Sequence, residues 1–128
     1  MTFQHDLLPG EPIMLVTLFE DFNFATDLPH STGATFKLLE SVNEPVFLID
    51  DLQRVDIALD DLTTAASITS RGDNPLYHHP KIREVLFVTS YETTRMAIKG
   101  LTTDTFGNVR ARLFDTLGEA LAYARSKY

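Results

Sequence analysis

Five aspartates follow a short apolar run in the middle of the chain. The run covers residues 46–49, and the acidic side chains are Asp50, Asp51, Asp56, Asp60 and Asp61. A continuous apolar run of this length is typical of a strand that is buried on both faces. Its carboxyl end would bring these carboxylates to one edge of a sheet. Carboxylates bind hard cations, but this spacing matches no calcium-binding loop, so we expect no metal here.

Two of these aspartates also have a purely structural interpretation. Asp60 and Asp61 fall in the first turn of a helix that the spacing of Leu59, Leu62 and Ala66 predicts. Negative side chains at that position usually complement the helix dipole, and we favour this interpretation. The functional alternative is an acidic surface that faces a protein partner.

A second group of polar residues surrounds another predicted helix start. Thr89, Ser90, Thr93 and Arg95 place hydroxyl groups and a guanidinium after the apolar strand 85–89. Free amides at a helix N-terminus attract anions, so this group is a candidate anion-binding site. The same stretch also fits a capping box, in which Glu92 reaches back to the Thr89 amide. We favour the capping box.

Other chemistry finds little support in the sequence. The chain contains no cysteine, which excludes disulfides, thiolate catalysis and cysteine-based zinc sites. The adjacent pair His78 and His79 has diverging side chains and no acidic ligand close in sequence, so we interpret it as solvated rather than metal-binding. No phosphate-binding glycine loop and no nucleophile elbow is present. We therefore expect neither a cofactor nor an enzyme.

Composition limits the partners. The chain has 128 residues, of which 44% are hydrophobic, and this fits one domain spanning residues 1–128. The formal net charge of -7 disfavours binding to nucleic acid or to anionic membranes. No apolar run approaches the roughly 20 residues of a membrane span, and the N-terminus does not resemble a secretory signal. We expect a cytoplasmic protein.

The elements that position these groups alternate along the chain. Turn residues at 8–12 predict a hairpin between the first two strands. We expect an α/β fold with a mixed, mostly parallel sheet of about five strands and about four helices. The predicted strands cover residues 2–8, 13–19, 46–49, 85–89 and 109–114. One predicted helix covers residues 26–42, and one further helix follows each of the third, fourth and fifth strands.

Several local features add detail. Thr26 is the predicted N-cap of the first helix, and Gly33 is expected to break or fray it near residues 31–34. Thr116 and Glu119 form a second capping box. Arg110 and Arg112 guard the edge strand against pairing. The unguarded edge at residues 2–8 therefore predicts a homodimer.

Three segments of the chain carry a family resemblance, namely residues 16–25 (VTLFEDFNFA), 49–55 (IDDLQRV) and 114–121 (FDTLGEAL). In their order and spacing they resemble the STAS domains, the fold of the anti-sigma-factor antagonists, and the resemblance extends over nearly the whole chain. It implies the SpoIIAA-like α/β fold. Antagonists of this type carry a phosphorylatable serine, and the matching position here is Asp60, flanked by Asp61 and Thr63. The phosphorylation switch is therefore not expected.

The combined interpretation is a non-enzymatic regulatory or protein-binding module. Its candidate partner-binding or phosphoacceptor-equivalent residues are Asp56, Asp60, Asp61 and Thr63. The alternative is a small-molecule or anion-binding carrier or enzyme that uses the helix start at Thr89 to Arg95. The sequence does not identify the protein partner.

Overall fold

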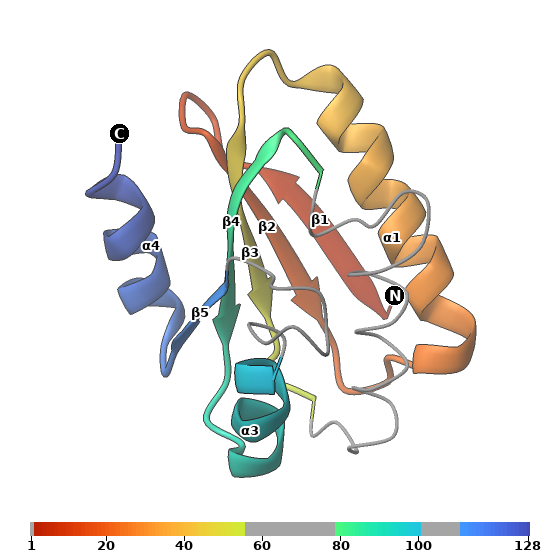
Figure 1. Ribbon diagram of the computed structural model, residues 1–128. Helices are drawn as coiled ribbons and strands as arrows, with labels where there is room; N and C mark the ends of the chain where they lie inside the picture. The colour runs from red at the N-terminus through yellow and green to blue at the C-terminus, as the bar shows by residue number, and fades with distance from the viewer. Residues whose placement is uncertain (1, 56–78, 101–110) are drawn as a thin grey trace.

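Five strands form one sheet in the order β1-β2-β3-β4-β5 (Figure 1). This computed structural model describes residues 2–55, 79–100 and 111–128. β1 runs antiparallel to β2, and the other neighbours are parallel, so the predicted mixed, mostly parallel sheet is confirmed. The strands are Phe3–Leu7 (β1), Ile13–Leu18 (β2), Val46–Asp51 (β3), Ile82–Val88 (β4) and Ala111–Phe114 (β5).

The predicted hairpin connects β1 and β2. Gly10 has a φ of 72°, a left-handed conformation that glycine adopts without steric cost. The amide of Leu8 donates to the carbonyl of Ile13 at 3.1 Å, and that of Glu11 donates to the carbonyl of Leu8 at 3.2 Å. These bonds close the turn and set the register in which Leu7 faces Met14.

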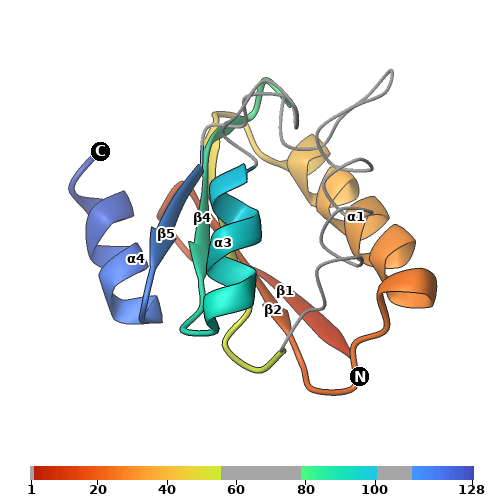
Figure 2. The same cartoon turned by 60° about the horizontal axis from the view of Figure 1, so that its bottom comes forward.

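Helices cover the two faces of the sheet unequally. In Figures 1 and 2, α1 (Phe24–Ser41) and α3 (Glu92–Gly100) lie on one side, and α4 (Leu117–Arg125) lies on the other, beside β5. Leu39 of α1 and Ile98 of α3 belong to one core cluster, while Ala120 and Ala124 of α4 belong to a second. The two crossover helices that the structure describes therefore share one face, as the fold predicts.

The central strand is as buried as its sequence indicates. Every residue from Val46 to Ile49 is at most 2% exposed, and alternate side chains enter the two core clusters. β4 lies beside it, and Val85, Leu86 and Val88 have no exposed surface. Two neighbouring strands with apolar side chains on both faces form the rigid centre of the domain.

The first helix starts earlier than predicted. The Asn23 side chain accepts a hydrogen bond from the Thr26 amide at 3.2 Å, and the Asn23 amide donates to Asp27 Oδ2 at 2.8 Å. Asn23 thus satisfies an amide of the first turn, and Thr26 as the N-cap is wrong. Both residue types are good caps, but Asn23 leaves Phe24 inside the helix, where its ring lies 4.9 Å from that of Phe22.

The predicted break at Gly33 is also wrong. α1 runs without interruption through 18 residues. A Cβ atom at Gly33 would meet no atom within 4 Å, so the glycine serves no close approach. Glycine costs the helix about 1 kcal/mol relative to alanine. The burial of Leu39 and its apolar neighbours stabilises the helix by more than this. At the other end, the Lys81 ammonium donates to the carbonyls of Leu39 and Val42 at 3.1 and 3.0 Å, which helps to close the helix.

The last strand and helix follow their sequence signals. β5 forms the sheet edge, and Arg112 on it pairs with Glu84 at 2.8 Å. Thr116 is the N-cap of α4 and accepts from the Glu119 amide at 3.2 Å. Its hydroxyl also donates to the Glu119 carboxylate at 3.1 Å, so the reciprocal contact uses the hydroxyl rather than the Thr116 amide. The predicted helix after β3, the loop through Gly72 and the residues at 101–110 lie outside the described residues.

Candidate functional site at the carboxyl edge of the sheet

The exit of β3 is held by several local hydrogen bonds. Asp51 Oδ1 accepts from the amide and the side chain of Gln53 at 3.1 and 3.0 Å. The Leu52 amide donates to the Val88 carbonyl at 2.9 Å. Leu52 and Val55 are buried, and Asp50 is only 9% exposed. The chain therefore leaves the sheet in a fixed direction, with Asp51 and Gln53 at its surface.

The acidic candidates come directly after this exit. The described chain stops at Val55, one residue before Asp56. Asp56, Asp60, Asp61 and Thr63 lie outside the described residues, so their role as a partner-binding surface stays a prediction. The structure does fix the place where this segment starts, at the carboxyl ends of β3 and β4.

Thr89 closes the neighbouring strand rather than capping a helix. Its amide donates to the Phe114 carbonyl at 3.0 Å, which extends the pairing of β4 with β5 by one residue. Its hydroxyl accepts from the Tyr91 amide at 3.2 Å. Because the Thr89 amide already has a partner, the predicted capping box with Glu92 is wrong. α3 begins only at Glu92.

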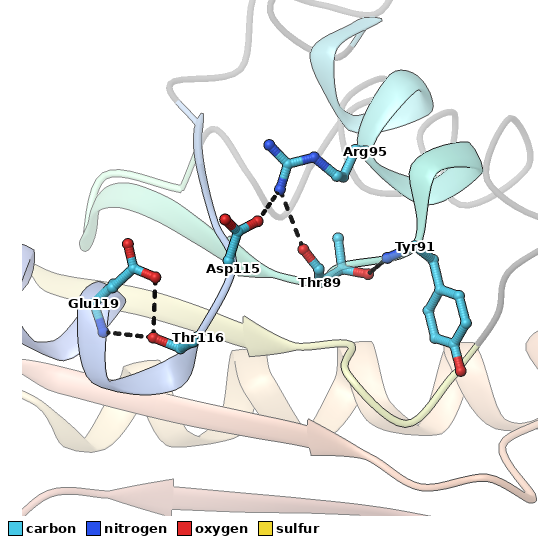
Figure 3. Close-up of polar contacts among 6 residues, drawn as sticks. All are labelled: Thr89, Tyr91, Arg95, Asp115, Thr116 and Glu119. Atoms are coloured by element: carbon cyan, nitrogen blue, oxygen red, sulfur yellow. Dashed lines mark hydrogen bonds and ion pairs between the residues drawn. The ribbon is translucent and has the colours of Figure 1, made fainter.

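Arg95 connects α3 to the entry of α4. Its guanidinium forms an ion pair with Asp115 and donates to the Thr89 carbonyl at 3.4 Å (Figure 3). In Figure 3 the arginine extends toward Asp115, while the Tyr91 side chain points to the opposite side. The guanidinium at this candidate anion site is thus already neutralised by a carboxylate.

The hydroxyl groups of this helix start differ in exposure. Ser90 and Thr93 are exposed, and Thr94 is fully buried. Within the described part of the chain, Thr94 Oγ1 is a buried side-chain oxygen without a hydrogen-bond partner. Its i, i+4 spacing with Ile98 marks it as a core-facing residue, and that spacing is visible in the sequence. The sequence does not reveal that the hydroxyl group lacks a hydrogen-bond partner.

Two histidines lie away from this edge in partly buried positions. His5 Nε2 is 2.9 Å from Thr35 Oγ1, which joins β1 to α1, and burial lowers the pKa of His5. His79 Nδ1 accepts from the Lys81 amide at 3.0 Å. Burial lowers the pKa of His79, and the Lys81 charge lowers it further. An accepting Nδ1 leaves one ring nitrogen of His79 for other contacts.

Residues 2–55, 79–100 and 111–128 contain no group of three or more His, Cys, Asp or Glu side chains placed to hold a metal ion. In the same ranges, no helix is long and apolar enough to cross a membrane.

Solved structures identify the fold. No protein-family model and no curated protein matches the sequence. An uncharacterised protein of the DUF3478 family from Shewanella loihica PV-4, described as having a SpoIIAA-like fold, matches 95% of this chain and 91% of its own, with a TM-score of 0.58 and 13% identity. An anti-sigma factor antagonist from Mycobacterium paratuberculosis matches 96% and 94% of the two chains, with a TM-score of 0.54 and 17% identity. This chain therefore has the STAS-like, or SpoIIAA-like, α/β fold that its sequence resembles.

Proposed function

We propose that the protein is a non-enzymatic regulatory module that binds a protein partner at the carboxyl edge of its sheet. The observation that carries this proposal is the fold, which a solved anti-sigma factor antagonist shares over nearly the whole of both chains. A shared fold is an argument by analogy, so the site has to support it separately.

The exit of β3 supplies that support. Leu52 and Val55 are buried, so the last described residues before the acidic segment are anchored in the core. With a net charge of -7, the chain favours a partner with a basic surface. Asp60 stands where the resemblance places a phosphorylatable serine and is charged without a kinase. Because no kinase or phosphatase changes the charge of an aspartate, we expect constant rather than switched binding.

Affinity capture from the native host tests the proposal when matched variants are compared. The Asp60→Lys/Asp61→Lys double variant should lose the captured partner. The Glu40→Lys/Glu44→Lys variant changes the charge equally at two exposed positions and should keep it. Calorimetry with the purified partner should then give similar affinities for the native chain and the Glu40→Lys/Glu44→Lys variant. The Asp60→Lys/Asp61→Lys variant should bind more weakly. Equal capture by all three proteins, or equal loss in both variants, would contradict the proposal.

The second candidate function is binding of a small anion at the start of α3. The exposed hydroxyl groups of Ser90 and Thr93 favour it, because they lie beside the free amides of the first turn of α3, where anions bind. The ion pair of Arg95 with Asp115 opposes it. Thermal shift assays with an anion and metabolite panel separate the two functions. Stabilisation that is lost in Thr93→Ala and Arg95→Gln would support the site at Thr89, Ser90, Thr93 and Arg95.

We also propose self-association through β1, the sheet edge without arginines. The half-buried rings of Phe3 and Phe24 pack against the first core cluster, so an apolar strip over these rings is not the driving surface. The surface proposed to drive self-association is therefore the unpaired edge of β1 together with Leu7, which is 36% exposed. Light scattering should give twice the 14.4 kDa monomer mass, reduced by Leu7→Lys but not by Met96→Lys on α3. A monomer mass for the native chain would refute this.

A further inference from the structure

A shallow hollow lies at the end of the sheet opposite the proposed partner site. It is lined by residues at the start of β3 and β4 and by Lys127, which follows α4. Figure 1 shows the starts of these two strands near its top. Its apolar lining consists of Pro45, Phe47, Pro80 and Ile82. Arg83, Glu84 and Lys127 complete the lining. The hollow therefore combines apolar walls with charged groups.

Positive charge gathers around this hollow although the chain is acidic. Of its lining residues, Arg83 and Lys127 are cationic and Glu84 is anionic. Glu84 pairs with Arg112 at 2.8 Å, and Glu11 pairs with Arg125 at 2.7 Å. Hydrogen bonds from Arg125 and then from Tyr128 lower the pKa of Glu11 to about 2, so that carboxylate is ionised at neutral pH. The cations left over are Arg83 and Lys127.

Arg83 and Lys127 are held in place by uncharged groups. The Arg83 guanidinium carbon lies 4.7 Å from the centre of the Phe47 ring, and Nη2 donates to the Lys127 carbonyl at 3.3 Å. The Lys127 ammonium lies 5.2 Å from the Tyr123 ring. Among the described residues, neither cation forms an ion pair with a carboxylate. The contact with the ring leaves most of the five N–H donors of Arg83 available.

Glu84 lines the hollow but does not neutralise these cations. Its Oε1 accepts from the Tyr123 hydroxyl at 2.7 Å, and its Oε2 accepts from Arg112 Nε. Burial, and then the hydrogen bond to Glu84, raise the pKa of Tyr123, so this phenol stays a neutral donor. Both carboxylate oxygens of Glu84 therefore accept hydrogen bonds from α4 and β5 rather than from Arg83 or Lys127.

We propose that this hollow binds the phosphate monoester of a small molecule. The guanidinium of Arg83 presents parallel N–H donors that match phosphate oxygens, and Lys127 adds a second positive charge. A phosphate monoester carries about -1.5 to -2 charges at pH 7, which matches the two unpaired cations. Pro45, Pro80 and Phe47 contact the apolar part of the ester. Phe47 and Ile82 expose at most 7% of their surface, so their contact with the apolar part of the ester is small.

NMR titration of the ¹⁵N-labelled chain tests the proposal with three probes: phenyl phosphate, inorganic phosphate and phenol. Phenyl phosphate should shift the amides of Phe47, Arg83 and Lys127 saturably. Inorganic phosphate should shift the same amides with weaker affinity, and phenol should not. Equal affinity for phenyl phosphate and inorganic phosphate, or shifts that do not saturate, would overturn the proposal.

Arginine variants provide the matched control. Arg54 also lies over a ring, 5.2 Å from the centre of Phe19, but near the β3 exit. Arg83→Gln should weaken phenyl phosphate binding by about tenfold or more, as expected for the loss of a charge-assisted hydrogen bond, and Arg54→Gln should leave it unchanged. Arg83→Lys keeps the charge and should fall between them. Equal losses in Arg83→Gln and Arg54→Gln would show a non-specific charge effect and refute the site. Arg83 is exposed, so both variants at position 83 should keep the melting temperature of the native chain.

Discussion

Gly33 offers a sharp test of the structure, because the same substitution has opposite expected effects at two glycines. Gly33 lies inside α1, is exposed, and has open space where a Cβ would stand. Alanine is favoured over glycine by about 0.8–1.0 kcal/mol in a helix interior, and no clash offsets this gain. Gly33→Ala should therefore raise the free energy of unfolding by about 0.5–1 kcal/mol. For a domain of this size that raises the melting temperature by roughly 2–5 °C.

Gly10→Ala is the matched control. Gly10 also has open space around it, but its φ of 72° disfavours any residue with a Cβ. The substitution should lower stability by about 1 kcal/mol. Urea unfolding of both variants and the native chain, followed by circular dichroism, measures the two differences. A Gly33→Ala variant that is less stable than the native chain would refute the continuous helix and restore the break that the sequence predicts.

Three further substitutions test other parts of the fold. Leu39→Ala removes a fully buried side chain from the first core cluster and should cost about 2–5 kcal/mol in urea unfolding. Thr94→Val replaces a buried hydroxyl without a partner, so stability should stay equal or rise, and a clear loss would reveal a partner for that oxygen. Burial lowers the pKa of His5 below 6.5, so the unfolded chain binds this proton more readily. The contribution of His5 to stability is therefore complete above about pH 6.5 and declines as the pH falls toward the folded-state pKa, and His5→Gln should flatten that part of the pH profile.

The strands were predictable because their signals are local. The apolar runs at β3 and β4, the turn around Gly10 and Arg112 on the last strand each specify burial or an edge within a few residues. The first helix was harder. Asn23 and Thr26 are both suitable caps, and the choice depends on how Phe24 packs against Phe22, which a linear pattern does not contain.

The polar sites were less predictable because their partners are distant in sequence. The Thr89 amide could only be assigned to a capping box until the pairing with Phe114 was known. Arg95 looked free to bind an anion because Asp115 comes 20 residues later. The hollow is even less local, since Phe47, Arg83 and Lys127 come from three separate segments. No spacing rule connects them.

The two proposed sites use opposite ends of the same strand, which bears on whether they communicate. β3 carries Phe47 in the lining of the hollow and Asp51 at the exit that precedes the acidic segment. The residues between them, Leu48 to Asp50, are at most 9% exposed and are flanked by hydrogen-bonded strands on both sides. Coupling between sites requires an element with two arrangements whose balance both ligands change. A strand held in this way offers no second arrangement, so phenyl phosphate should not alter the affinity for the protein partner.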